Sequence, residues 1–306
     1  MTDKASNSAT AYLESALGAP VSEPAKSVAQ ALAEKYPGAA IFLYGSGISV
    51  SSNENPTQIL FDFYVIVPDY DQAIANPLEM LAARLLAPNV YYFETQTPYG
   101  RLRSKYALLS IEAFRRLAGP ETFHSYFWAR FAQPSRLVTC PADGESELFR
   151  IVCGAIETFL VRSQGLAENP QDWREVWLKG MNASYRAELR AENSDRAAKL
   201  IASYGDWPQR TAAFALRADA DGKNYGTIIA WKARAVFGAV LSVARLLKAT
   251  TTFQGGIDYI AWKIKRHSGV DIAVKPWERK HPFIAAPIVA IRYYRLRADA
   301  SKAVET

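Results

Sequence analysis

The sequence predicts an α+β fold in which a mixed sheet precedes a mostly helical region. In the first 140 residues, short runs rich in β-branched and aromatic residues alternate with amphipathic segments. From about residue 145 onward, apolar residues instead recur at helical spacing through several long segments. Proline, glycine and acidic residues cluster between these regions, in "CPADGESE" at 140–147. We therefore expect one domain at 1–140 and a helical domain at 141–306.

The elements of the first domain are predicted from the residues that begin and end them and from their apolar runs. The segment 24–36 begins at a proline and stops before Pro37-Gly38, which is typical of a helix. The apolar runs 39–45 and 59–67 have the length and composition of buried strands. The remaining predicted elements are a helix at 77–87, strands at 89–96 and 101–110 joined by the turn "TPYG", and a helix from 111. In the second domain the predicted helices are 146–163, 172–190, 194–205, 224–248 and 257–269.

Composition narrows the functional classes. The 306 residues are 49% hydrophobic and 12% aromatic, which indicates a folded globular chain. There are 36 basic against 30 acidic residues, a balance that suits an anionic partner such as a nucleotide or an acidic lipid surface. Two cysteines argue against a disulfide framework and fit a reducing compartment. Three histidines without metal-ligand spacing argue against zinc.

Membrane contact is predicted to be peripheral. The N-terminus has no apolar core of a signal peptide, and the apolar run 235–247 is interrupted by Arg245, so we expect no spanning helix. The segment 227–248 is either an interfacial helix or, as we favour, a core helix whose basic residues are solvated. The tail 281–297 is apolar, then aromatic and basic, which fits a membrane anchor or a closing element of the fold.

A glycine-rich turn and a strand acid are the strongest chemical signal. The stretch Tyr44–Gly47 follows the first predicted strand, and Asp62 lies inside the second. Glycine lets a backbone approach phosphate oxygens closely, and a strand acid can hold Mg²⁺ against a triphosphate. The pattern predicts nucleotidyl transfer; the alternative is an ordinary turn and a strand acid satisfied within the fold. The usual second acid, two residues further on, is replaced by Tyr64.

With further residues, the chain resembles the mitochondrial-type phosphatidate cytidylyltransferases, peripheral CDP-diacylglycerol synthases also found in some bacteria. The likeness covers roughly residues 39–266 and looks like that of a divergent, bacterial-like member. It rests on the order of these short motifs along the chain: Tyr44-Gly45-Ser46-Gly47, Asp62-Phe63-Tyr64, Asp69, Lys105-Tyr106, Arg130 with Pro134, Ser184-Tyr185 with Glu188 and Arg190, and Lys248 with Gly255, Tyr259 and Lys263.

The resemblance implies a nucleotidyltransferase-like sheet domain followed by the helical domain. It implies transfer of CMP from CTP to phosphatidate, giving CDP-diacylglycerol and diphosphate. Asp62 and Asp69 are then the expected Mg²⁺ ligands, and Asp62, Lys105 and Glu188 the expected catalytic groups. The expected nucleotide-binding residues are Tyr44, Gly45, Ser46, Gly47, Arg130, Arg190 and Lys248.

Each of these roles has a plainer alternative. Asp69 follows a proline and can simply start a turn, and Lys105 can be an exposed edge-strand lysine. Glu188 can be a solvated helical acid, and Arg130 and Arg190 can be surface arginines.

The resemblance also sets expectations about partners and location. The expected location is cytoplasmic, peripheral on the inner face of the membrane. No nucleic-acid partner is expected, because no basic stripe with interleaved aromatics is evident. The chain lacks the family's Trp-His and His-Tyr-Ser stretches and its terminal Ser-Lys, which puts the lipid acceptor in question. Another phosphorylated acceptor, or a non-catalytic lipid- or nucleotide-binding role, therefore remains an alternative.

Overall fold

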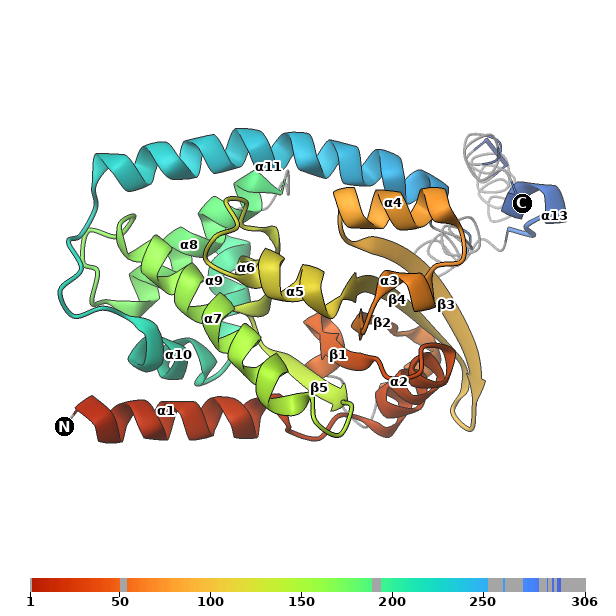
Figure 1. Cartoon of the computed structure of the whole chain (residues 1–306), viewed down its shortest axis with the longest axis horizontal. Coiled ribbons are helices and arrows are strands. Elements are labelled where there is room, and N and C mark those ends of the chain that lie inside the picture. Colours follow the sequence, from red (N-terminus) through yellow and green to blue (C-terminus); the bar gives the residue numbers. More distant parts are fainter. Residues whose placement is uncertain are drawn as a thin grey trace, which may run out of the picture.

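A single mixed sheet, flanked by helices, organises the first half of the chain (Figure 1). The computed structural model describes residues 2–49, 54–188, 194–252, 261, 272–280, 285, 288 and 291–292. The five strands lie in the order β3-β4-β2-β1-β5. Their bounds are β1 Ala40–Tyr44, β2 Leu60–Val67, β3 Asn89–Thr97, β4 Gly100–Ser110 and β5 Ser135–Thr139. The predicted α+β class is confirmed.

The register of the sheet aligns one row of polar side chains. β1 pairs antiparallel with β2 and β5, β3 pairs antiparallel with β4, and β2 runs parallel to β4. Tyr44 lies opposite Asp62, Asp62 opposite Lys105, and Lys105 opposite Tyr92. Side chains in such a row project to the same face of a sheet. Four adjacent strands therefore place these four residues side by side on one face.

The opposite face of the sheet is packed against helix α2 (Glu23–Lys35). Phe63 and Tyr106 are register partners and are fully buried there. The hydroxyl of Tyr36, at the end of α2, lies 2.8 Å from that of Tyr106. A buried apolar layer of this kind supplies most of the driving force for folding.

The polar row shares its face with an aromatic layer. Tyr64, two residues after Asp62, packs on Phe131 of α6 (Tyr126–Phe131) with ring centroids 4.8 Å apart. Phe42 contacts Phe114 of α5 (Ile111–Ala118) in the same layer. These helices cover the part of the face that follows Asp62 along β2, while Asp62 itself stays partly exposed. The acid therefore lies where the buried strand emerges toward solvent.

Helices form the rest of the molecule, with α1 along one edge and α11 along the opposite edge (Figure 1). Apolar side chains of the sheet and of these helices form one continuous core. The predicted boundary at 140 falls between β5 and α7, and the division into domains stays a prediction. The remaining helices are α1 Thr2–Leu17, α3 Tyr70–Ala73, α4 Pro77–Leu85, α7 Glu145–Gln164, α8 Trp173–Ala187, α9 Ser194–Ser203, α10 Trp207–Ala215, α11 Tyr225–Thr252 and α13 Pro276–Lys280, with short 3₁₀ turns at Gly45–Ser49 and Pro56–Gln58.

The predicted helices and strands inside the described residues are confirmed to within a few residues, although α8 ends at Ala187, short of the predicted 190. Six helices and strands were not predicted: α1, α3, α6, α10, α13 and β5. Most of the predicted helix 257–269 lies outside the described residues. In the part of the chain that the structure describes, one segment, Tyr225–Arg245 of α11, is long and apolar enough to cross a membrane by length and composition. The expectation that no helix spans stays a prediction.

Candidate functional site

An ion pair between two neighbouring strands forms the centre of the candidate site. Lys105 Nζ on β4 lies 3.1 Å from Asp62 Oδ1 on β2. The side chains are 38% and 23% exposed, so both can meet a ligand from solvent. The pairing follows directly from the parallel register, which sets the two residues opposite one another. Lys105 thus balances the charge of an acid that would otherwise stand alone in the aromatic layer.

The predicted glycine turn lies against this ion pair. Gly45 has φ of 72°, a left-handed conformation that favours glycine. A Cβ built at Gly45 would lie 3.5 Å from Asp62 Oδ2. Gly47 has a different role, because a Cβ there would press on Leu43 and Phe61 at 3.1 and 3.3 Å. Ser46 between them is exposed, so the turn presents backbone and hydroxyl groups beside Asp62.

A buried charged pair lies behind Tyr44. Arg130 Nη2 of α6 is 3.7 Å from Glu188 Oε2, at the C-terminal end of α8, and both side chains are largely buried. The Arg130 guanidinium lies 5.5 Å from the centre of the Tyr44 ring, and the rings of Tyr44 and Tyr64 are 4.8 Å apart. The fold therefore gathers six predicted site residues: Tyr44, Gly45, Asp62, Lys105, Arg130 and Glu188.

Burial and neighbouring charges fix the protonation of this layer. Burial raises the pKa of Tyr44 well above its usual value, and the nearby Asp62 carboxylate raises it further. Tyr44 is therefore a neutral hydrogen-bonding group. Burial alone would lower the pKa of Arg130, but Glu188 and the surrounding tyrosines outweigh it and raise that pKa above its usual value. Arg130 is a permanent cation beside Tyr44.

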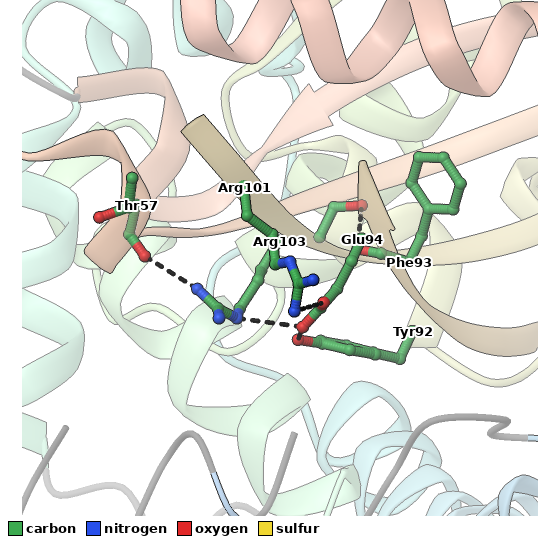
Figure 2. A network of polar contacts seen from close by, with 7 residues as sticks. Thr57, Tyr92, Phe93, Glu94, Arg101 and Arg103 are labelled. Atoms are coloured by element: carbon green, nitrogen blue, oxygen red, sulfur yellow. Dashed lines mark hydrogen bonds and ion pairs between the residues drawn. The ribbon is translucent and has the colours of Figure 1, made fainter. Parts of the chain in front are cut away.

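A second polar network extends the row across β4 and β3 (Figure 2). Arg103 donates from Nε to Glu94 at 3.1 Å and from Nη1 to the Thr57 carbonyl at 3.2 Å. Arg101 lies 3.5 Å from Glu94, and Tyr92 donates its hydroxyl to the same carboxylate. The sequence analysis did not identify these residues. Their signal is the period-two spacing of cations at 101, 103 and 105, which places all three on one face of a strand.

Asp69 requires a correction, because the structure does not bring it to Asp62. It caps the short helix α3 by accepting a hydrogen bond from the Asp71 amide at 3.1 Å, and Arg84 lies 3.6 Å away. Seven residues of nearly extended chain separate Asp69 from Asp62, about 23 Å at about 3.3 Å per residue. The two carboxylates cannot bind one metal ion. The alternative interpretation of Asp69 as the start of a turn is the one the structure supports.

Lys248 also has a different role from the one expected. Its ammonium donates to the carbonyls of Leu86 and Pro88, the latter at 2.8 Å, and Arg245 donates to the Ala87 carbonyl at 2.9 Å. Burial, with Arg245 nearby, lowers the pKa of Lys248 to about 7. These contacts tie α11 to the segment between α4 and β3.

The expected nucleotide-binding residue Arg190 lies outside the described residues, as do Gly255, Tyr259 and Lys263.

The donor set fits Mg²⁺ only in company with a substrate. Among the described residues, no group of three or more His, Cys, Asp or Glu side chains is placed to hold a metal. Asp62 is the one predicted carboxylate ligand beside the glycine turn. Mg²⁺ in nucleotide sites commonly takes one or two carboxylates, with phosphate and water oxygens completing the shell. Asp62 satisfies that minimum, provided the triphosphate supplies further oxygens.

A surface cavity of about 500 Å³ lies elsewhere, between α1, β5 and α7. Its lining includes Glu14, Glu145, Phe149 and Arg150, and none of the site residues above. We assign the candidate site to the polar row because chemistry requires converging charged groups and not simply volume.

Searches against protein-family models and against curated proteins found no match for this chain. The fold and the site therefore define the chain only by its geometry. It is an α+β protein whose mixed sheet presents an acid–lysine pair beside a glycine turn.

Proposed function

We propose that the chain is a Mg²⁺-dependent nucleotidyltransferase that transfers CMP from CTP to phosphatidate, giving CDP-diacylglycerol and diphosphate. One observation carries the proposal: the left-handed turn at Gly45 lies directly against Asp62, which pairs with Lys105 on the next strand. This arrangement offers close backbone approach, a metal ligand and a cation within one small area. Those are the elements that a triphosphate needs. The choice of CTP and phosphatidate rests on the family resemblance of the motifs.

The proposed reaction requires the protein to align the phosphatidate oxygen with the α-phosphorus of CTP and to neutralise the charge on both substrates. A phosphate oxygen of phosphatidate, already an anion at neutral pH, attacks the α-phosphorus of CTP. The new bond joins that oxygen to phosphorus, and the bond to the β-phosphate oxygen breaks, so diphosphate leaves with the electron pair. No strong general base is required, so the site does not need a histidine. Bringing two anions together is the main barrier that the protein must lower.

The residues of the polar row divide this task. Lys105 lies where it can contact a phosphate while still close to Asp62, and Arg103 adds a second cation on the same strand face. Tyr44 stays neutral and Arg130 stays charged behind the turn, so the field around the triphosphate is fixed before it binds. When Mg²⁺ is bound, Asp62 would hold it, and the ion would offset charge on the phosphates.

A non-catalytic nucleotide-binding role is the second candidate. Two observations favour it: Tyr64 occupies the place of the usual second acid and is buried in the aromatic layer, and Asp62 is paired with a lysine. Such a protein would bind nucleotide without turnover. A nucleotidyltransferase with a different phosphorylated acceptor would instead turn over CTP, but not with phosphatidate. In each case the expected location, cytoplasmic and peripheral at the inner membrane face, stays a proposal.

Diphosphate release tests these candidates together. The purified chain is incubated with Mg²⁺ and each of the four NTPs, with and without phosphatidate in detergent micelles. We expect release only with CTP and phosphatidate together. Release with CTP and a different phosphorylated acceptor would replace the lipid substrate. A melting-temperature rise with nucleotide but no release in any mixture would support the non-catalytic candidate.

A further inference from the structure

Helix α11 turns an apolar face toward solvent. Ile229, Val236, Val240 and Val243 are about half to two-thirds exposed, with 70% for Val236 and 63% for Val240. Their spacings of seven, four and three residues place them along one side of a helix. Isolated exposed aliphatic residues are common, but an aligned row of them is not. Figure 1 shows this helix running along the outer edge of the molecule.

This arrangement corrects our expectation for 227–248. A helix advances about 100° per residue, so Trp231 points about 140° away from Val236. Trp231 is buried and donates to the Arg162 carbonyl at 3.0 Å, whereas the valines face outward. The apolar residues therefore form two faces, one packed in the core and one exposed. The preferred interpretation of 227–248 as a core helix was therefore wrong for Val236, Val240 and Val243, which are exposed.

The packed face holds α11 in a fixed orientation. Arg234 is largely buried and donates to the Phe123 carbonyl at 2.9 Å. A Cβ added at Gly238 would lie 2.4 Å from the Ala187 carbonyl oxygen, so α11 packs closely on the end of α8. Together with Arg245 and Lys248, these contacts place charged groups on the inner side of the helix. The outward row therefore lies on the side of the helix away from these contacts.

Helix α4 adds a second set of exposed aliphatic side chains. Leu78, Leu81 and Leu85 are 78%, 53% and 77% exposed and repeat every three or four residues. α4 lies next to the C-terminal part of α11 (Figure 1), and Arg245 and Lys248 of α11 bond to the carbonyls that follow α4. We define the α11–α4 face as these three leucines with Ile229, Val236, Val240 and Val243.

We propose that the α11–α4 face docks on an anionic phospholipid bilayer. The proposal rests on the proposed function, which requires a lipid acceptor, and adds the surface through which the chain reaches it. α11 has no acidic residue over its 28 residues. Three of its four basic residues, Arg234, Arg245 and Lys248, bond to carbonyls on the inner side. The outward side therefore presents the positive charge of Lys232 to anionic headgroups. Lys232 is exposed on this helix and can reach a headgroup beside the apolar row.

The composition of the face favours lipid over a protein partner. Valine and leucine dominate it, and these types are under-represented among the residues that dominate protein interfaces, where Trp, Tyr and Arg lead. Aliphatic side chains on a helix with basic residues are instead typical of helices that lie in the membrane interface. A second copy of this chain is the competing occupant, and the test below distinguishes it.

Docking by this face would bring the bilayer to the side of the molecule where α11 borders the site. Arg245 stacks on Tyr126 of α6 at 4.3 Å, and its lowered pKa, due first to burial, is partly offset by Tyr126, Tyr64 and Glu188. Through Arg245 on its inner side, α11 therefore connects the exposed valines of its outer side with the buried layer behind Tyr44. In the tail, Glu278 of α13 pairs with Arg292, so that arginine already has a carboxylate partner within the tail.

Vesicle sedimentation with matched variants tests the proposal. The full chain is mixed with vesicles of phosphatidylcholine containing phosphatidylglycerol, and with phosphatidylcholine vesicles alone. We expect the double variant Val236→Glu with Val240→Glu to lose at least tenfold in partitioning to anionic vesicles. The control is Gln209→Glu with Ala213→Glu, which adds the same charge at exposed positions of α10 and should bind within twofold of wild type. Equal losses in both variants would overturn the proposal, as would no loss in the first.

A direct readout of insertion does not depend on the folding of the glutamate variant. A polarity-sensitive fluorophore on Val240→Cys should shift to shorter wavelength with anionic vesicles, whereas one on Gln209→Cys should not. An unchanged spectrum would contradict docking by this face. A dimer in sedimentation equilibrium that Val236→Glu with Val240→Glu converts to monomer, without any spectral shift on vesicles, would assign the face to self-association and overturn the proposal.

These outcomes separate docking from the proposed chemistry. Nucleotide binding is followed in parallel by the melting-temperature shift with Mg²⁺ and CTP, which needs no membrane. Vesicle binding through this face without any nucleotide effect would leave the docking surface standing and reject nucleotidyl transfer. A normal melting-temperature shift with CTP but no vesicle binding would reject the docking surface and leave the nucleotide site standing.

Discussion

At the scale of single residues, Asp62 is explained by its position on β2. An acid inside an apolar strand is tolerated because it lies near the beginning of the strand, partly exposed, with Lys105 3.1 Å away. The sequence analysis could identify both residues and the Gly45 turn from local patterns. It could not establish that Asp62 and Lys105 pair, because β2 and β4 are parallel and β3 lies between them in the chain. That register depends on tertiary packing.

Removing the Asp62 carboxylate should abolish turnover without unfolding the chain. We expect Asp62→Asn to lower the rate of diphosphate release by about 100-fold or more, because metal-assisted charge stabilisation is worth several kcal/mol. The matched control is Asp69→Asn, which removes a carboxylate from a helix cap far from the glycine turn and should keep most of the rate. An Asp62→Asn enzyme retaining more than about a tenth of wild-type activity would refute the metal-ligand role.

Partly buried His124 should make the fold sensitive to mild acid. Burial, with Arg245 and Arg116 nearby, lowers the pKa of His124 to about 4, against about 6.5 in the unfolded chain. Between these values the unfolded chain binds the additional proton, so stability is lost as the pH falls from about 6.5 to about 4. The loss should approach about 3 kcal/mol. Denaturant unfolding at pH 7, 5.5 and 4.5 measures it, and His124→Phe should flatten the slope; equal slopes would contradict this role.

At the scale of elements, local pattern predicted long segments and missed short ones. β5 has five residues and α6 has six, too few to show a period, and α6 is apolar around most of its circumference. Yet these two elements complete the sheet and bring Arg130 to Tyr44. The position of Arg130 could therefore be proposed only through family resemblance. Asp69 was misassigned because its role was taken from the family resemblance, although the predicted strand at 59–67 already places it about 23 Å of extended chain from Asp62.

The turn at Gly45 can be tested against a glycine with the same backbone conformation. Gly45→Ala should destabilise the chain by about 1 kcal/mol, because an L-residue is strained at this φ. It should also weaken nucleotide binding, since the added methyl would lie close to Asp62. Gly205→Ala has a similar φ of 59° with open space around it, so it should cost similar stability only. Equal effects of the two variants on the CTP-induced melting shift would argue against a nucleotide at this turn.

At the scale of the whole molecule, the chain combines an open polar row with an exposed apolar face. Residues from β1, β2, β4, α6 and the end of α8 meet around Tyr44, although they span positions 44 to 188 in the sequence. α11 links this cluster to the edge of the molecule through Arg245. A protein that transfers a nucleotide onto a membrane lipid needs both surfaces at once. Under the proposed function, the exposed valines and leucines would form the membrane-docking surface.

The transfer of label from CTP to lipid tests the central claim most directly. The chain is incubated with Mg²⁺ and vesicles containing phosphatidate, and with CTP labelled at either the α- or the γ-phosphate. Our account predicts that α-label enters the chloroform-extractable lipid in equal amount to the diphosphate released, while γ-label stays in the aqueous phase. Asp62→Asn should show neither. Absence of α-label from the lipid, in a preparation that binds both CTP and vesicles, would contradict the account.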